Sequence, residues 1–139
     1  IITNSKKDRH PDHEAASRLV KKACFLSGLV KISTRYEGKN QSPWRPKSIL
    51  YSIQNNYVDP DFVIDITKFY DKKVEAINCF KSQFYDPKSK EPKSFISSKE
   101  FMNFINSRAI EMGHSIGTTY GEGFTSENKL QVNSLNSII

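Results

Sequence analysis

Two histidines, an aspartate and an arginine occupy the segment Arg9-His10-Pro11-Asp12-His13, near the start of the chain. Imidazole nitrogens and carboxylate oxygens are common zinc ligands, and a catalytic zinc site has three protein ligands and an open position for water. His10 and His13 are three positions apart at the start of a predicted helix, so both rings can face one pocket. Asp12 can bind a metal or fix the tautomer of an imidazole. The helix N-terminus would favour an anionic ligand or a developing oxyanion.

Two other interpretations fit the same five residues. In the first, they form a polar helix start in which Asp12 and Glu14 interact with the helix dipole and both histidines are exposed. Spacing alone does not separate this from a metal site, because H-x-x-H is a short pattern with many chance matches. In the second, His-Pro-Asp is the tripeptide with which J-domain co-chaperones engage Hsp70. That class needs a basic amphipathic helix before the tripeptide, whereas residues 1–9, IITNSKKDR, resemble the end of a strand.

A predicted helix positions these side chains. From Glu14 to Leu26 apolar residues recur every three or four positions, which is helical periodicity. Pro11 suits the first helical position, His10 the cap before it, and Gly28 the C′ position after the helix. We therefore expect the histidines and Asp12 at the start of this helix.

The rest of the chain alternates between short strand patterns and helical patterns. Thr67 is the expected N-cap of a second helix, and Ser97 with Glu100 forms a capping box at the start of a third. The glycines of TTYGEGFTSE, residues 118–127, predict a tight irregular turn rather than a strand. In chain order we expect a loop at 33–46, strands at 48–54 and 61–67, a helix at 68–84, a polar loop at 85–96 and a frayed tail at 127–139. This alternation indicates an α/β layered fold.

Composition limits the function classes. A chain of 139 residues fits one domain, and no apolar run is long enough for a membrane helix. The net charge of +6 suits anionic partners, but the basic residues are scattered, so we expect neither a nucleic-acid partner nor a membrane. Cys24 and Cys79 lie on predicted apolar helix faces, so we expect buried free thiols in a reducing cytoplasm. His114 has no partner nearby in sequence and is expected at the surface.

Five segments together resemble the C-terminal part of the LmbE-like (PIG-L) zinc-dependent N-deacetylases. The resemblance covers about residues 5–126, and it is strongest to the branch that deacetylates N-acetylglucosaminyl-malate in bacillithiol biosynthesis. It implies a Rossmann-like three-layer α/β/α domain, of which residues 1–139 would be the C-terminal portion. The segments are, in order, DRHPDHEAASRLVKKACFLSGLVK, FVIDIT, KKVEAINCFKSQF, ISSKEFMNFINSRAIEMG and IGTTYGEGF.

The resemblance also implies roles for the opening segment. His13 matches a zinc ligand, His10 the imidazole that stabilises the tetrahedral oxyanion, and Asp12 the carboxylate that orients a histidine. The implied reaction is hydrolysis of the acetamide of a small sugar conjugate in the cytoplasm, with Zn²⁺ or another divalent metal as cofactor. Related enzymes assemble into oligomers, so a homo-oligomer is possible.

Other positions of the resemblance carry less chemistry. Arg9 completes the motif, and Arg108 could pair with a substrate carboxylate or lie at the surface. Tyr120 and Glu122 could line the pocket rim or belong to a plain turn. We take these four as candidate substrate-binding residues.

One part of the family pattern is absent. The family carries an Ala-His-x-Asp-Asp-x-Glu motif that supplies two zinc ligands and the general base, and the chain contains no His-x-Asp-Asp. We therefore expect this chain to be the C-terminal part of a deacetylase and to be inactive alone. The alternative is a non-catalytic α/β remnant or interaction module.

Overall fold

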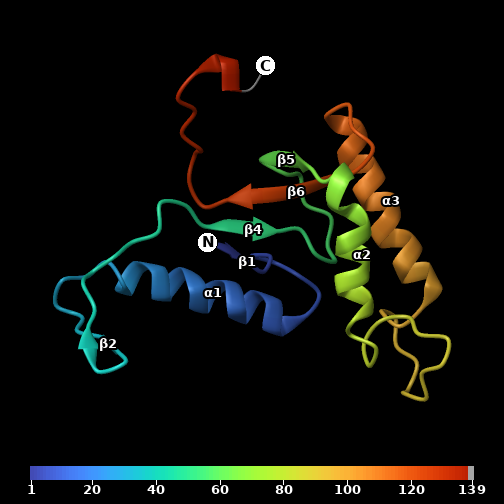
Figure 1. Ribbon diagram of the computed structural model, residues 1–139, viewed down its shortest axis with the longest axis horizontal. Helices are drawn as coiled ribbons and strands as arrows, with labels where there is room; N and C mark the ends of the chain where they lie inside the picture. The colour runs from blue at the N-terminus through green and yellow to red at the C-terminus, as the bar shows by residue number, and fades with distance from the viewer. Residues whose placement is uncertain (138–139) are drawn as a thin grey trace. The chain divides into compact units, whose positions relative to one another are not determined.

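The computed structural model describes residues 1–137 and has an α/β architecture with a mixed sheet (Figure 1). Contacts divide the chain into two compact units, one formed by Ile1–Asp61 and the chain from Phe124 onward, the other by Phe62–Gly123. Strand β6 (Gly121–Ser126) begins in the second unit and ends in the first. The mixed sheet with helices confirms the α/β fold class that the sequence predicts.

In the first unit the opening segment follows β1 (Ile2–Thr3), an edge strand of the four-stranded sheet. Strand β1 pairs in parallel with β4 (Leu50–Ser52), which pairs antiparallel with the end of β6. Helix α1 (Pro11–Leu26) follows β1 and packs beside it (Figure 1). Tyr51, Cys24 and Phe124 form the buried core. A small hairpin of β2 (Arg35–Tyr36) and β3 (Lys39–Asn40) lies within the predicted loop, and a 3₁₀ turn, η2 (Leu135–Ser137), ends the described chain.

The start of α1 matches its prediction. His10 is the N-cap in extended conformation, Pro11 is the first helical residue, and the Asp12 N–H donates to the His10 side chain. Ser27 is the C-cap, and Gly28 follows it without a positive φ. Gly28 instead leaves room for Arg45, whose Nε would lie 2.5 Å from a Cβ placed there. Gly28 therefore occupies the predicted C′ position, without the left-handed backbone that glycine often adopts there.

The second unit contains β5 (Phe62–Asp65), the 3₁₀ turn η1 (Thr67–Phe69), α2 (Tyr70–Asn78) and α3 (Lys99–Ser115). β5 neighbours β6 in the sheet, and the Ile66 N–H donates to the Tyr120 carbonyl at 3.0 Å. Helices α2 and α3 run side by side in Figure 1, joined by the Tyr70 hydroxyl, which donates to Asn106. Ala109 and Met112 fill the core of this unit.

Both predicted caps in this unit are wrong. α2 begins at Tyr70 after Phe69, which makes no side-chain cap, and Thr67 instead accepts the Tyr120 N–H at 3.1 Å. α3 begins one residue later than expected, because the Ser98 hydroxyl accepts the Phe101 N–H. With Ser98 as N-cap, the third helical residue is Phe101 rather than Glu100, so no capping box forms. Helix α2 is also much shorter than the predicted 68–84.

The predicted turn at residues 118–127 is wrong as well. It contains β6, and Gly121 serves close packing rather than a reversal of the chain. A Cβ on Gly121 would lie 2.7 Å from both the Gly113 nitrogen and Val63 Cγ1. Only glycine fits this approach of strand and helix, because real Cβ contacts are longer. The glycines that do require a positive φ are Gly38 and Gly117.

Two further expectations are settled by exposure. Cys24 is buried, but Cys79 is exposed at the C-cap of the shortened α2, so its predicted burial is wrong. His114 is exposed in the last turn of α3, as expected. Within residues 1–137, none of the helices is long and apolar enough to cross a bilayer. The last two residues of the predicted frayed tail, 138 and 139, lie outside the described residues.

Candidate functional site

The two histidines of the opening segment lie close together at the start of α1. Their ring centroids are 5.1 Å apart and tilted by 30°. The His10 side chain is 54 % exposed and that of Asp12 is 87 % exposed, with His10 Nδ1 4.0 Å from Asp12 Oδ2. His13 is 32 % exposed. Both rings are therefore reachable from solvent at the positive end of the helix dipole.

Behind His13 lies a carboxylate that the sequence did not single out. Asp8 has a side chain that is 0 % exposed, and its Oδ2 is 3.6 Å from His13 Nδ1. Its carboxyl oxygens accept backbone N–H groups of Asn55 at 2.9 Å and His10 at 3.4 Å. Burial raises the pKa of Asp8, but these backbone donors and the nearby His13 outweigh it and hold the pKa below its usual value. Asp8 is therefore a carboxylate at neutral pH.

The turn before α1 holds Asp8 in place. The Asp8 N–H donates to Glu14 Oε1 at 3.3 Å, and the other oxygen of Glu14 pairs with Arg18 at 3.4 Å. Residues of α1 therefore fix the segment that leads into it. Arg9, a predicted substrate contact, is exposed within this turn.

Among the side chains at the start of α1, His13 is the one whose surroundings suit a metal ligand. His13 Nδ1 is buried and faces the Asp8 carboxylate at 3.6 Å, with no hydrogen-bond partner among residues 1–137. A carboxylate beside one ring nitrogen is a common neighbour of a metal-binding imidazole. Within residues 1–137, no three His, Cys, Asp or Glu side chains are grouped closely enough to hold a metal ion. The described part of the chain therefore does not contain a complete set of metal ligands.

The other three candidates lie in the second unit, each with a partner. The Tyr120 ring stacks on Tyr70 at 3.8 Å, with the planes 8° apart. The Glu122 carboxylate accepts from the Lys73 ammonium at 2.6 Å. The Arg108 guanidinium lies 4.5 Å over the Phe104 ring of the same helix. Whether any of them contacts a substrate stays a prediction.

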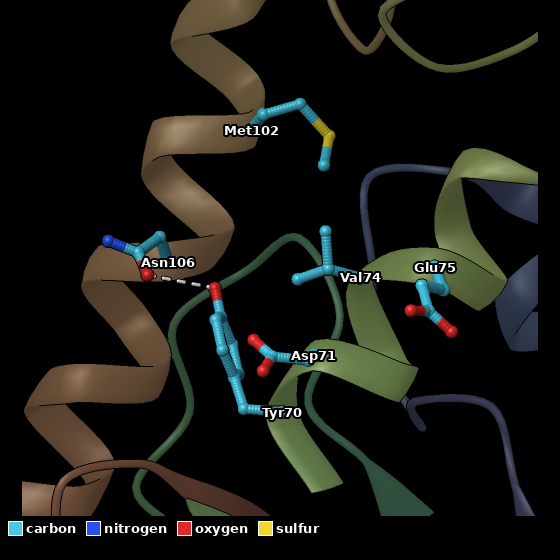
Figure 2. Close-up of a pocket in the computed structure, with 6 residues that line it drawn as sticks. All are labelled: Tyr70, Asp71, Val74, Glu75, Met102 and Asn106. Atoms are coloured by element: carbon cyan, nitrogen blue, oxygen red, sulfur yellow. Dashed lines mark hydrogen bonds between the residues drawn. The ribbon is translucent and has the colours of Figure 1, made fainter.

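A pocket of about 440 Å³ opens between α2 and α3 of the second unit. Figure 2 shows Tyr70 reaching across it to Asn106, with Oη and Oδ1 2.9 Å apart. Burial, and then the neighbouring Tyr120 and Asp71, raise the pKa of the Tyr70 hydroxyl, so it stays a hydrogen-bond donor. The pocket is lined by Tyr70, Asp71, Val74, Glu75, Met102 and Asn106, none of which the sequence suggested.

No protein-family model matches the chain. Several solved structures, however, are similar to it. The conserved protein TT1542 from Thermus thermophilus superimposes with a TM-score of 0.77 at 26 % identity, over 94 % of this chain and 52 % of that one. The N,N'-diacetylchitobiose deacetylase from Pyrococcus horikoshii, complexed with its inhibitor MPG, gives 0.68 at 21 %, over 99 % and 49 %. GalB, the 4-carboxy-2-hydroxymuconate hydratase from Pseudomonas putida, gives 0.65 at 19 %, over 96 % and 54 %.

The chain shares their fold. It spans about half the length of each of these three proteins, so it corresponds to part of their structure. Because one of them is named a deacetylase and another a hydratase, the fold alone does not decide the reaction. The function of this chain must therefore be judged from the side chains at the start of α1.

Proposed function

We propose that this chain is the C-terminal part of a metal-dependent N-deacetylase of the LmbE-like (PIG-L) family, with a Rossmann-like three-layer α/β/α domain. One observation carries the proposal most. Two histidines, His10 and His13, lie 5.1 Å apart at a helix N-terminus with the buried Asp8 behind one of them, in a chain that shares the fold of a deacetylase. The chain covers about half of each similar structure, which supports the proposal that it is one part of such an enzyme.

His13 is the proposed zinc ligand of this chain, and the remaining ligands and the general base come from a preceding part of the protein. When bound, zinc supplies Lewis-acid polarisation of a carbonyl and lowers the pKa of water. His10, half exposed beside His13, donates a hydrogen bond to the oxygen of the acetyl group as negative charge develops there. Asp12 orients the His10 ring, because its backbone N–H donates to His10 Nδ1 at 3.2 Å, and the dipole of α1 favours the same negative charge.

The reaction is hydrolysis of an acetamide. Water adds to the acetyl carbonyl, the C–N bond breaks, the nitrogen takes a proton, and acetate and a free amine leave. The proposed substrate is a small N-acetylglucosaminyl conjugate in the cytoplasm, with N-acetylglucosaminyl-L-malate as the first candidate. Arg9 is the proposed contact of this segment for a malate carboxylate. Arg108, Tyr120 and Glu122 stay predicted substrate contacts. A homo-oligomer is compatible with this proposal.

The test is acetate release by the full-length protein that carries this chain. We expect acetate from N-acetylglucosaminyl-L-malate, less from N,N'-diacetylchitobiose, and none after removal of metal by a chelator. The 139-residue chain alone serves as the matched control and is expected to release none. Failure to release acetate from either conjugate, in the zinc-loaded full-length protein, would favour the alternative of a non-catalytic interaction module.

A further inference from the structure

Asp8 is a buried side chain to which the proposed reaction gives no role. Its carboxylate is enclosed completely, and both oxygens accept backbone N–H groups, from Asn55 at 2.9 Å and from His10 at 3.4 Å. These bonds fix the carboxylate with respect to the first turn of α1. One of its oxygens, Oδ2, faces His13 Nδ1 at 3.6 Å.

The carboxylate selects one tautomer of His13. A carboxylate accepts hydrogen bonds and cannot donate them. An unprotonated Nδ1 would direct its lone pair toward the negative Oδ2, whereas a protonated Nδ1 is attracted to it. Nδ1 is buried and, within residues 1–137, has no hydrogen-bond partner, so the facing carboxylate is the main influence on its protonation. In the neutral ring the proton is therefore on Nδ1, and the lone pair is on Nε2.

His10 is held in the opposite form. Its Nδ1 accepts the Asp12 backbone N–H at 3.2 Å, as the N-cap of α1. An accepting Nδ1 carries a lone pair, so the proton of the neutral ring is on Nε2. Two rings with centroids 5.1 Å apart thus present different groups at Nε2, a hydrogen-bond donor on His10 and a lone pair on His13.

We infer that Asp8 is a positioning residue that fixes His13 with its Nε2 lone pair free for a metal ion, while the first turn of α1 fixes His10 as an Nε2–H donor. The metal part of this inference rests on the proposed function, but the two tautomers do not. The two fixed tautomers explain how one short segment supplies both a metal ligand, His13, and a hydrogen-bond donor, His10. Neither ring can take the role of the other. Such partners of metal-binding histidines change metal affinity by about 10–100-fold when removed.

Long-range ¹H–¹⁵N NMR of the histidine side chains tests the tautomers in the metal-free chain, at a pH where the rings are neutral. We expect the Nδ1–H form for His13 and the Nε2–H form for His10, with the two signals assigned from His13→Ala and His10→Ala. In Asp8→Asn, the His13 signal is expected to move toward the Nε2–H form while the His10 signal stays. The control is Asp86→Asn in the other unit, which makes the same change at a carboxylate that also accepts a backbone N–H, from Lys88 at 2.8 Å.

The Nε2–H form for His13 in the folded wild-type chain would overturn the inference, and this holds even if Asp8→Asn does not fold. A second measurement, zinc affinity of the full-length protein by competition with a chelating dye, separates the two proposals. A loss of about 10–100-fold in Asp8→Asn, and none in Asp86→Asn, supports the role of Asp8. Tight zinc binding that Asp8→Asn leaves unchanged overturns that role and leaves the proposed function standing. The expected tautomers in a full-length protein that binds no zinc would contradict the proposed function and retain the inference on the rings.

Discussion

At the scale of single residues, the chemistry of this chain depends on what holds each titratable side chain. Outside the histidine segment, the clearest case is Glu127, just after β6. Its carboxylate accepts from Lys21 and from the Tyr51 hydroxyl at 2.7 Å, and it pairs with Lys6 at 3.3 Å. Lys21 first, and then Tyr51 and Lys6, lower the pKa of Glu127 to about 2. The burial of Tyr51 and the same carboxylate raise the pKa of that hydroxyl.

The depressed pKa makes Glu127 a source of acid sensitivity. Because the folded-state pKa is below the unfolded value, the stabilisation is complete above about pH 4.5 and is lost as the pH falls toward 2. We expect Glu127→Gln to lower the free energy of unfolding at neutral pH by about 1–2 kcal/mol and to weaken the pH dependence between these limits. Urea titrations followed by circular dichroism at several pH values measure both effects. Glu91→Gln, in an exposed loop, is the control and should change neither, and equal curves for Glu127→Gln and wild type would refute the assignment.

At the scale of elements, the start of α1 could be predicted because each of its signals is local. The periodicity, the proline and the residue before it lie within or beside the helix itself. The N-terminus of α3 was placed one residue early, since Ser97 and Ser98 are equivalent in sequence and only the geometry of the turn selects Ser98. Strand β6 was missed because its glycines resemble turn residues, whereas Gly121 is needed for the close approach of Gly113 on α3.

The cap of α3 gives a direct test at this scale. Ser98→Ala removes the acceptor for the Phe101 N–H and is expected to cost about 1 kcal/mol of stability. Lys99→Ala, at the exposed next position, should change stability by less than about half of that. Thermal unfolding followed by circular dichroism compares the two variants, and an equal loss in both would contradict the assignment of the cap.

Gly121 tests why β6 contains glycine. A Cβ there would lie 2.7 Å from backbone atoms of Met112 and Gly113, which cannot move without shifting α3. We expect Gly121→Ala to destabilise the chain by more than about 2 kcal/mol. Gly38→Ala is the comparison, because that glycine has a φ of +76° and no atom within 4 Å of the added Cβ, so only backbone strain of about 1 kcal/mol is added. If urea titrations showed a larger loss of stability in Gly38→Ala than in Gly121→Ala, close packing would be excluded as the reason for glycine at position 121.

The candidate site shows the same division between local and distant signals. His10, Asp12 and His13 could be singled out as candidates because they are close in sequence and lie at the start of a predicted helix. Asp8 was not, because its burial and its bond to Asn55 depend on a segment 47 positions away. A partial signal was present, since an aspartate two residues before a helix cap often accepts the N–H of that cap. The sequence could not indicate that the same carboxylate also faces His13.

At the scale of the whole molecule, the proposed function makes this chain one part of a longer protein. It covers about half of each similar structure, and its described residues bring together one proposed zinc ligand rather than three. The zinc affinity of the 139-residue chain is therefore expected to be at least about 100-fold weaker than that of the full-length protein. Titration with zinc in the presence of a competing chelator measures this ratio. Equal affinities would mean that the described residues form a complete site by themselves.

The most direct test of the central claim is the zinc content of the full-length protein, measured together with its deacetylation rate in wild type, His13→Ala and His10→Ala. The account predicts that His13→Ala loses its zinc, whereas His10→Ala keeps a stoichiometric amount and loses about 10²–10³-fold in kcat. Equal zinc content in wild type and His13→Ala would contradict it.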